Sequence, residues 1–114
     1  MGALKEVNIK SDLPTADTAV KRVTYSIANC RSLGYSAIKI IHGYGSTGRG
    51  GKIRTEVRAY LSRLEHQGKI RGYIPGEDFS IFSAETRDAF ALCDALRQDS
   101  DLERSNNGVT IILL

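Results

Sequence analysis

The residues of this chain that could do chemistry gather in one segment, from His42 to Arg58. His42 follows an apolar run and precedes a stretch that holds five of the eleven glycines. Glycine-rich backbone ahead of a helix offers unpaired N–H groups and the positive end of the helix dipole, which together suit a phosphate group. Lys52 and Arg54 then bring cations into the first turns of that helix. The segment is therefore predicted to bind an anion.

Each part of this segment has its own expected contribution. The glycines permit positive φ and a close approach of the backbone to a ligand. Arg54 and Arg58 share a helix face because they are four residues apart, and their forked donors match a phosphate. Tyr44 could stack on a base. The candidate phosphate-binding residues of the segment are His42, Gly43, Tyr44, Gly45, Ser46, Gly48, Arg49, Gly50, Gly51, Lys52, Arg54 and Arg58.

His42 is the candidate whose role is most open. It could act as general acid or base in phosphodiester cleavage, donate a hydrogen bond to a phosphate, or brace the loop through backbone hydrogen bonds. The second histidine, His66, is expected to be solvated at the end of a helix. Cys30 and Cys93 lie among apolar residues at helical spacing, so both are expected to be buried. Two cysteines and two histidines without paired spacing predict no zinc site.

Composition points to one small globular domain with a divided charge. The 114 residues are 41% hydrophobic and 25% charged, and no apolar run is long enough to span a bilayer. The N-terminus lacks the apolar core of a signal peptide, so a cytoplasmic location without a membrane partner is expected. Residues 1–75 carry thirteen Lys and Arg against five Asp and Glu, whereas residues 76–106 carry three against eight. This basic body with an acidic appendage favours a polyanionic partner.

The apolar pattern predicts a two-layer α/β fold. The expected elements are strands at 4–10, 37–41, 70–74 and 109–114 and helices at 15–34 and 53–67. Thr15 is the expected N-cap of the first helix, and Gly34 its stop. Right-handed crossovers would place both helices on one face of the sheet. The glycine loop then lies at the carboxyl end of the second strand, where α/β sheets usually bind ligands.

The acidic segment 76–106 is interpreted as a helical insertion before the last strand. Four apolar residues in it follow an i, i+3, i+4, i+7 rule, which predicts a third helix over 84–97. They are Ala89, Leu92, Cys93 and Leu96. Their apolar stripe must pack on something, either the open face of the sheet or a second copy of the chain. The second alternative would make the chain a homodimer.

Several of these residues resemble a known family. His42-Gly43-Tyr44-Gly45, the glycines up to Gly51 and the helix-opening Ile53-Arg54 look like the second motif of Smr (small MutS-related) domains, His-Gly-x-Gly before a Leu-Arg helix start. The run from Gly108 to Leu113 resembles the closing Gly-x-Thr strand of the family. The resemblance covers residues 4–75 and 107–114. It implies a fold like the C-terminal domain of translation initiation factor three, with nucleic-acid binding and, in some members, DNA-nicking or RNA-cleaving endonuclease activity.

The first motif of that family, Leu-Asp-Leu-His-Gly, is not matched. Val7-Asn8-Ile9-Lys10-Ser11 occupies its place. Asn8 cannot serve as a carboxylate base or a hard metal ligand, although Asp12 could substitute for the missing acid. Lys10 supplies a cation where the family has its histidine, so it joins the candidate phosphate-binding residues.

The sequence therefore predicts one Smr-like domain over residues 1–114 that binds DNA or RNA. The expected contacts are backbone phosphates, held by the glycine loop, Arg54 and Lys10. One alternative is a structure-selective endonuclease that uses His42, with Mg²⁺ or Mn²⁺ as the metal. The other is a protein-interaction module that acts through the acidic insertion. No further cofactor is expected.

Overall fold

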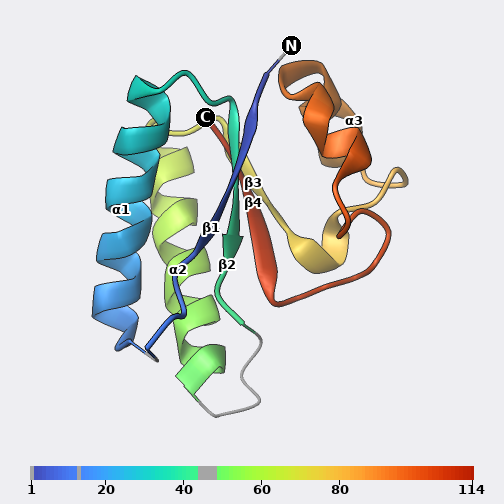
Figure 1. The fold of residues 1–114 in the computed structure, drawn as a ribbon. Helices are drawn as coiled ribbons and strands as arrows, with labels where there is room; N and C mark the ends of the chain where they lie inside the picture. Colours follow the sequence, from blue (N-terminus) through green and yellow to red (C-terminus); the bar gives the residue numbers. More distant parts are fainter. Residues whose placement is uncertain (1, 13, 44–48) are drawn as a thin grey trace.

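The chain forms a four-stranded sheet with two long helices on one face and a shorter helical segment on the other (Figure 1). This computed structural model describes residues 2–12, 14–43 and 49–114, with Arg49 and Gly50 described as helical backbone only. The strands are β1 (Leu4–Asn8), β2 (Ala37–Ile41), β3 (Gly72–Pro75) and β4 (Val109–Leu113). The helices are α1 (Ala16–Ser32), α2 (Arg49–His66) and α3 (Ala84–Leu92), with 3-10 turns η1 (Gly76–Asp78) and η2 (Asp94–Gln98).

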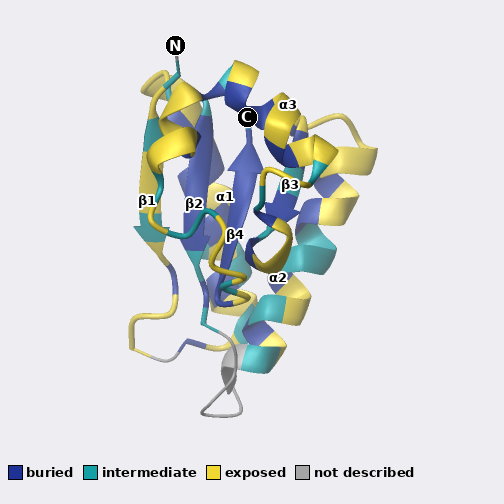
Figure 2. Ribbon diagram, turned by 90° about the vertical axis from the view of Figure 1, so that its right-hand side faces the viewer, coloured by how far each residue is buried: buried dark blue, intermediate teal, exposed yellow. Residues whose placement is uncertain are grey.

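The strand order, β1-β2-β4-β3, brings distant parts of the chain to one end of the sheet. β1 and β2 are parallel, whereas β4 is antiparallel to both of its neighbours, β2 and β3. The start of β4 therefore lies beside the ends of the other strands, and Ile41 pairs with Val109 while Pro75 pairs with Thr110. β2 and β4 form the buried centre of the sheet (Figure 2).

α1 and α2 pack side by side on one face of the sheet, which confirms the predicted α/β class and the placement of both helices (Figure 1). Thr15 caps α1 by accepting a hydrogen bond from the Thr18 N–H at 3.2 Å. Gly34, at φ +86°, follows the helix end in the left-handed conformation that glycine tolerates. None of the helices in the described residues combines the length and apolar character that a bilayer crossing requires.

α2 begins at Arg49, earlier than the predicted start at Ile53. Gly50 and Gly51 thus belong to its first turn rather than to a loop. Glycine has a low helix propensity, which costs about 1 kcal/mol per residue and by itself favours a loop here. Ile53 and Val57 are almost completely buried, and such burial is worth about 1.5–3 kcal/mol for each side chain, so packing outweighs propensity here.

The acidic segment packs on the open face of the sheet, but not as one helix over 84–97. α3 ends at Leu92 because Cys93 is extended, at φ −145°, and a 3-10 turn follows. This bend still lets Cys93 and Leu96 reach the core. The cluster on this face joins Phe79, Ala89, Phe90, Cys93 and Leu96 to Ala37, Ile74, Ile111 and Leu113 of the sheet. The apolar stripe is therefore covered within the chain and does not support the homodimer interpretation.

Lys39 anchors the acidic segment to the sheet. It points from the centre of β2 toward that segment and is only 3% exposed. Its Nζ lies 2.7 Å from a carboxylate oxygen of Asp101 and 3.1 Å from one of Asp99. Burial alone would lower the pKa of Lys39, but the hydrogen bonds to Asp101 and Asp99 outweigh it and raise the pKa. A lysine in the central strand is thus kept charged by the segment that covers it.

Candidate nucleic-acid interface

The candidate site lies where β1, β2 and β3 end and β4 starts. His42 directly follows β2, and Lys10 lies two residues beyond β1. Glu77 follows β3, and Thr110 is the second residue of β4. The insertion of β4 between β2 and β3 brings Thr110 between His42 and Glu77, although these residues are far apart in sequence.

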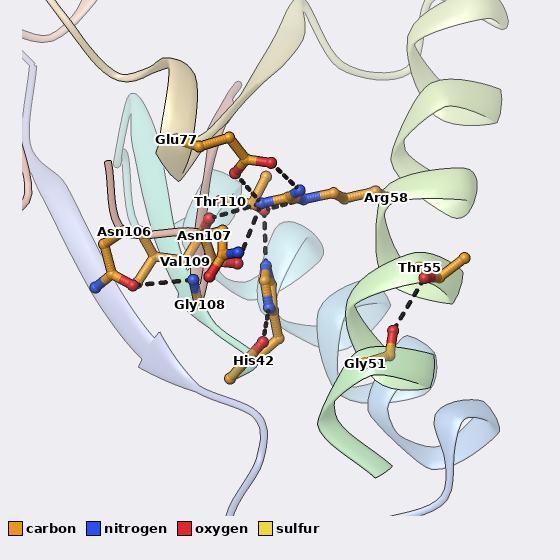
Figure 3. A network of polar contacts seen from close by, with 11 residues as sticks. His42, Gly51, Thr55, Arg58, Glu77, Asn106, Asn107, Gly108, Val109 and Thr110 are labelled. Atoms are coloured by element: carbon orange, nitrogen blue, oxygen red, sulfur yellow. Dashed lines mark hydrogen bonds and ion pairs between the residues drawn. The ribbon is translucent and has the colours of Figure 1, made fainter. Parts of the chain in front are cut away.

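His42 is fully buried, and both of its ring nitrogens are hydrogen-bonded (Figure 3). Its Nδ1 lies 2.8 Å from the carbonyl oxygen of Gly43, which can only accept, so Nδ1 carries a proton. The Thr110 hydroxyl lies 2.8 Å from Nε2 and donates to it. The same hydroxyl oxygen accepts from Arg58 Nε at 3.0 Å. This order of donors and acceptors selects the neutral Nδ1–H tautomer of His42.

The surroundings of His42 keep it neutral at physiological pH. Desolvation by burial is the main reason that its pKa falls from 6.5 to about 4. The positive charges of Arg58 and Arg54 lower the pKa further, and the hydrogen bond to Gly43 only partly opposes them. A general acid or base must reach the reacting group directly or through one water. A buried, neutral ring with both nitrogens engaged is instead arranged to brace the surrounding backbone.

Arg58, one of the predicted phosphate ligands, is held by an internal ion pair. Its two terminal nitrogens donate to the two carboxylate oxygens of Glu77 at 2.7 and 2.8 Å. One of them also donates to the carbonyl oxygen of Val109 at 3.2 Å (Figure 3). Desolvation would raise the pKa of Glu77, but the hydrogen bonds and charge of Arg58 hold it below its usual value. Arg58 therefore ties α2 to β4 and η1.

Glu77 is positioned by the glycine that precedes it. Gly76 is buried, and a Cβ there would collide with the carbonyl oxygen of Asn106. Only glycine lets η1 approach the turn before β4 this closely. The Glu77 carboxylate can then meet the guanidinium of Arg58.

Gly43 has a conformational role, and its amide is already used. Its φ of +78° is one that glycine adopts readily. The N–H groups of His42 and Gly43 both donate to the carbonyl oxygen of Gly108 at 3.0 Å. These two amides therefore already donate to an acceptor inside the protein. The Gly43 N–H is not free to donate to the phosphate that the sequence analysis predicts for it.

Lys10 is exposed on a turn that is held on both sides. Its own N–H donates to the Asn8 side-chain oxygen at 2.9 Å, and Arg22 donates to the carbonyl oxygens of Ile9 and Ser11 at 3.2 and 2.9 Å. A Cβ on Gly43 would lie 3.3 Å from Lys10 Cδ, so the lysine side chain passes directly over Gly43. Lys10 thus lies over His42 and Gly43, which we call the His-Gly corner, while its charge faces solvent.

Two further candidates lie in the first turns of α2. Lys52 is exposed and lines a cavity of about 360 Å³ together with Thr15 and Arg63. Arg54 is half-buried, and its charge acts on the pKa values of His42 and Glu77. The remaining candidates lie outside the described residues or, for Arg49, have an undescribed side chain; they are Tyr44, Gly45, Ser46, Gly48 and Arg49.

Comparisons with known protein families and solved structures identify the family of this chain. The family model of the Smr domain matches residues 13–77, which is more than half of the chain. This chain belongs to the Smr family. Its structure is similar to the crystal structure of the Smr domain of Thermus thermophilus MutS2, with a TM-score of 0.58 and 22% identity over 96% of each chain. No curated protein sequence matched. Smr domains generally bind nucleic acid, which makes nucleic acid the partner class of the family.

The sequence analysis does not single out two residues of this site in the Smr domain, Thr110 and Glu77. Thr110 is the polar residue of a strand that is otherwise wholly apolar and buried, so it needs hydrogen-bond partners. That signal was readable in the Gly-x-Thr run, although it does not identify His42 and Arg58 as the partners. Glu77 carries no comparable signal, because it meets Arg58 only through the strand order.

Asp12, the proposed substitute for the missing acid, is exposed at φ +66° on the turn that carries Lys10. Over the described ranges, no three His, Cys, Asp or Glu side chains come together as a metal ion would require. Among the described residues, the exposed Lys10 lies next to a network in which His42, Thr110 and Arg58 are hydrogen-bonded to one another.

The replacement Thr110→Val is expected to lower the free energy of unfolding by about 1–3 kcal/mol. Valine keeps the shape of threonine, but it leaves His42 Nε2 and Arg58 Nε without the partner that they share. Urea unfolding of the two proteins measures the loss. The control is Thr55→Val, which removes an exposed hydroxyl that donates to the Gly51 carbonyl on α2. Equal losses in both variants would show that the network contributes nothing special.

Proposed function

We propose that this Smr domain is a nucleic-acid-binding module that holds backbone phosphates over the His-Gly corner. The observation that carries the proposal is a contrast between two sets of residues. His42 and Arg58 are satisfied inside the protein. Lys10, whose side chain passes Gly43, and Lys52, in the first turns of α2, are both exposed. Phosphates need exposed cations and not a proton-transfer group, so this arrangement favours binding over cleavage.

The proposed contacts come from two separate segments. Lys10 approaches from the turn after β1, over Gly43. Lys52 and Arg54 approach from the first turns of α2, where the first backbone N–H groups lack partners within the helix and the helix dipole is positive. Phosphate contacts position a nucleic acid without reading its bases, so we expect recognition of backbone or shape in either DNA or RNA.

The acidic segment lies largely apart from this surface. It covers the face of the sheet opposite α1 and α2 (Figure 1). Asp99 and Asp101 direct part of its negative charge to Lys39. Within this segment Glu77 does reach the site, where it neutralises Arg58, so the proposed phosphate contacts are those of Lys10, Lys52 and Arg54.

The endonuclease alternative requires His42 to leave the network described above. In its buried, neutral state it lies under the surface that a phosphodiester would reach. We therefore expect the wild-type domain to bind nucleic acid without cutting it, also with Mg²⁺ or Mn²⁺ present. Incubation of labelled duplex, branched and single-stranded DNA and RNA with each metal checks this directly. Cleavage that disappears in a folded His42→Gln variant would refute the proposal.

The double replacement of Lys10 and Lys52 by glutamine is expected to flatten the salt dependence of binding. On duplex DNA, log affinity falls with log salt by about 0.9 for each phosphate contact, so losing two contacts makes this negative slope shallower by about 2. Fluorescence anisotropy with labelled duplexes over a series of NaCl concentrations measures the slope.

The matched control for this experiment is Lys21→Gln, which removes an exposed lysine that pairs with Asp17 on α1. Its slope is expected to stay within error of the wild type. If the control and the double variant lose the same slope, binding is a property of the overall charge and not of the His-Gly corner.

A further inference from the structure

We propose that the hollow between β3, η1 and the start of α3 is a docking site for a basic, leucine-containing peptide segment of a partner protein. We call this hollow the acidic pocket, and its volume is about 550 Å³. Residues that line it include Tyr73, Pro75, Glu77, Asp78, Phe82 and Glu85. The proposal goes beyond nucleic-acid binding, because the pocket lies between β3 and the start of the acidic segment and its lining is acidic.

The charge of the pocket selects a cationic ligand. Three carboxylates line it, and none of its described lining residues is Lys, Arg or His. Glu77 is partly neutralised by Arg58, which leaves Asp78 and Glu85 as the main source of negative charge. The carboxylates and the ring of Phe82 together suit a guanidinium or ammonium group, which pairs with the former and is attracted to the face of the latter.

The rim of the pocket exposes an unusual amount of apolar surface. Phe82 is 85% exposed, and its neighbour Ile81 is 48% exposed. Large aromatic residues are enriched at protein interfaces, where they act as anchors. Two adjacent exposed apolar residues beside an acidic hollow therefore favour a ligand that has aliphatic side chains next to its cations.

The turn that presents Phe82 is held in place before any partner arrives. The Glu103 carboxylate accepts from the Ser80 hydroxyl at 2.9 Å and from the Ile81 N–H at 2.6 Å. Arg87 donates to the carbonyl oxygen of Ile81 at 2.7 Å. A rigid anchor loses little conformational entropy on binding, so the exposed ring is arranged for docking.

The free edge of β3 does not favour strand addition as the docking mode. Pro75 has no N–H, so it cannot donate a hydrogen bond to an added strand. Recognition in the pocket therefore relies on side chains of the partner segment. A segment that alternates cationic and aliphatic residues provides them.

A titration of the ¹⁵N-labelled full chain with a short capped peptide that alternates arginine and leucine tests the proposal. The expected result is salt-sensitive binding with shift changes centred on residues 80–85. Phe82→Ala is expected to weaken binding at least about tenfold, and Asp78→Asn combined with Glu85→Gln is expected to do the same. A peptide with glutamate in place of arginine is expected not to bind, and one with serine in place of leucine to bind more weakly.

The controls remove similar groups from elsewhere on the surface. Leu33→Ala deletes an apolar side chain on the turn after α1 that is 65% exposed, and Asp17→Asn removes an exposed carboxylate from α1. Both are expected to bind the peptide like the wild type. Unchanged affinity in Phe82→Ala, or shift changes centred outside the pocket, would overturn the proposal. So would Phe82-dependent self-association in sedimentation without peptide, since the surface would then serve a second copy of the chain.

Discussion

Lowering the pH from about 7.5 to about 5 is expected to reduce the free energy of unfolding of this domain by about 2 kcal/mol, because of His42. In the folded chain the pKa of His42 is about 4, whereas its ordinary value is 6.5. Above pH 6.5 the ring is neutral in both states and stability is unaffected. As the pH falls toward 4, the unfolded chain takes up a proton that the folded chain does not, so stability is lost across this interval.

Other groups with shifted pKa values act outside this pH window. The pKa values of Glu77 and Asp101 are held below their ordinary 4.5 and 3.8, so the stability that these carboxylates contribute is lost only at lower pH. Chemical denaturation at a series of pH values from 7.5 to 5 therefore isolates the histidines.

Two glutamine variants separate the histidines from each other. His42→Gln is expected to be less stable at pH 7.5 but to show a nearly flat dependence on pH. His66→Gln changes an exposed histidine at the end of α2 and is expected to keep the slope of the wild type. A flat wild-type profile, or a slope lost in His66→Gln instead, would mean that His42 is solvated and open to a substrate.

Much of the fold follows from local patterns in the sequence. The apolar spacing of α1, its Thr15 cap and the glycine after it predict the helix closely, and the predicted strand 37–41 has the bounds of β2. These features succeed because they are decided within a few residues. The α2 start and the third helix were predicted less well, since burial of Ile53 and the bend at Cys93 depend on what packs against them.

The sequence predicts a candidate site, but it does not predict the contacts within it. The His-Gly motif directly follows β2. Thr110 comes beside it because β4 pairs with β2, although the two strands are far apart in the sequence. The pattern of residues in α2 also cannot show that Arg58 faces Glu77 rather than solvent. The roles of His42 and Arg58 therefore depend on the strand order, which no short motif encodes.

Lys39 could have been noticed in the same way as Thr110. A lysine in the middle of an interior strand must either reach solvent or meet carboxylates, because burying an unpaired charge costs far more free energy than the packing of the strand provides. The acidic segment supplies the two nearest and most buried of those carboxylates, at Asp99 and Asp101, and β1 adds the more exposed Glu6 at 3.4 Å. The charge division in the sequence thus has a structural counterpart, since the acidic appendage is bound to the body through this lysine.

The replacement Lys39→Met is accordingly expected to lower the free energy of unfolding by about 3–5 kcal/mol, because it leaves Asp99, Asp101 and the more exposed Glu6 without their shared cation. Methionine fills most of the volume of the lysine stem, so the loss reflects charge more than packing. Urea unfolding gives the size of the loss, and hydrogen exchange over residues 84–106 shows whether the acidic segment detaches first.

Two further variants decide whether the ion cluster is the cause. Lys21→Met breaks an exposed pair with Asp17 and is expected to cost less than about 1 kcal/mol. Adding Asp99→Asn and Asp101→Asn to Lys39→Met removes the two most buried stranded charges and leaves only the exposed Glu6. It is expected to restore part of the stability, since the amides keep an oxygen that can accept hydrogen bonds. If the triple variant is less stable than Lys39→Met alone, the two aspartates support the segment through contacts other than Lys39. If it recovers, a single buried cation accounts for the attachment of the acidic segment to the sheet.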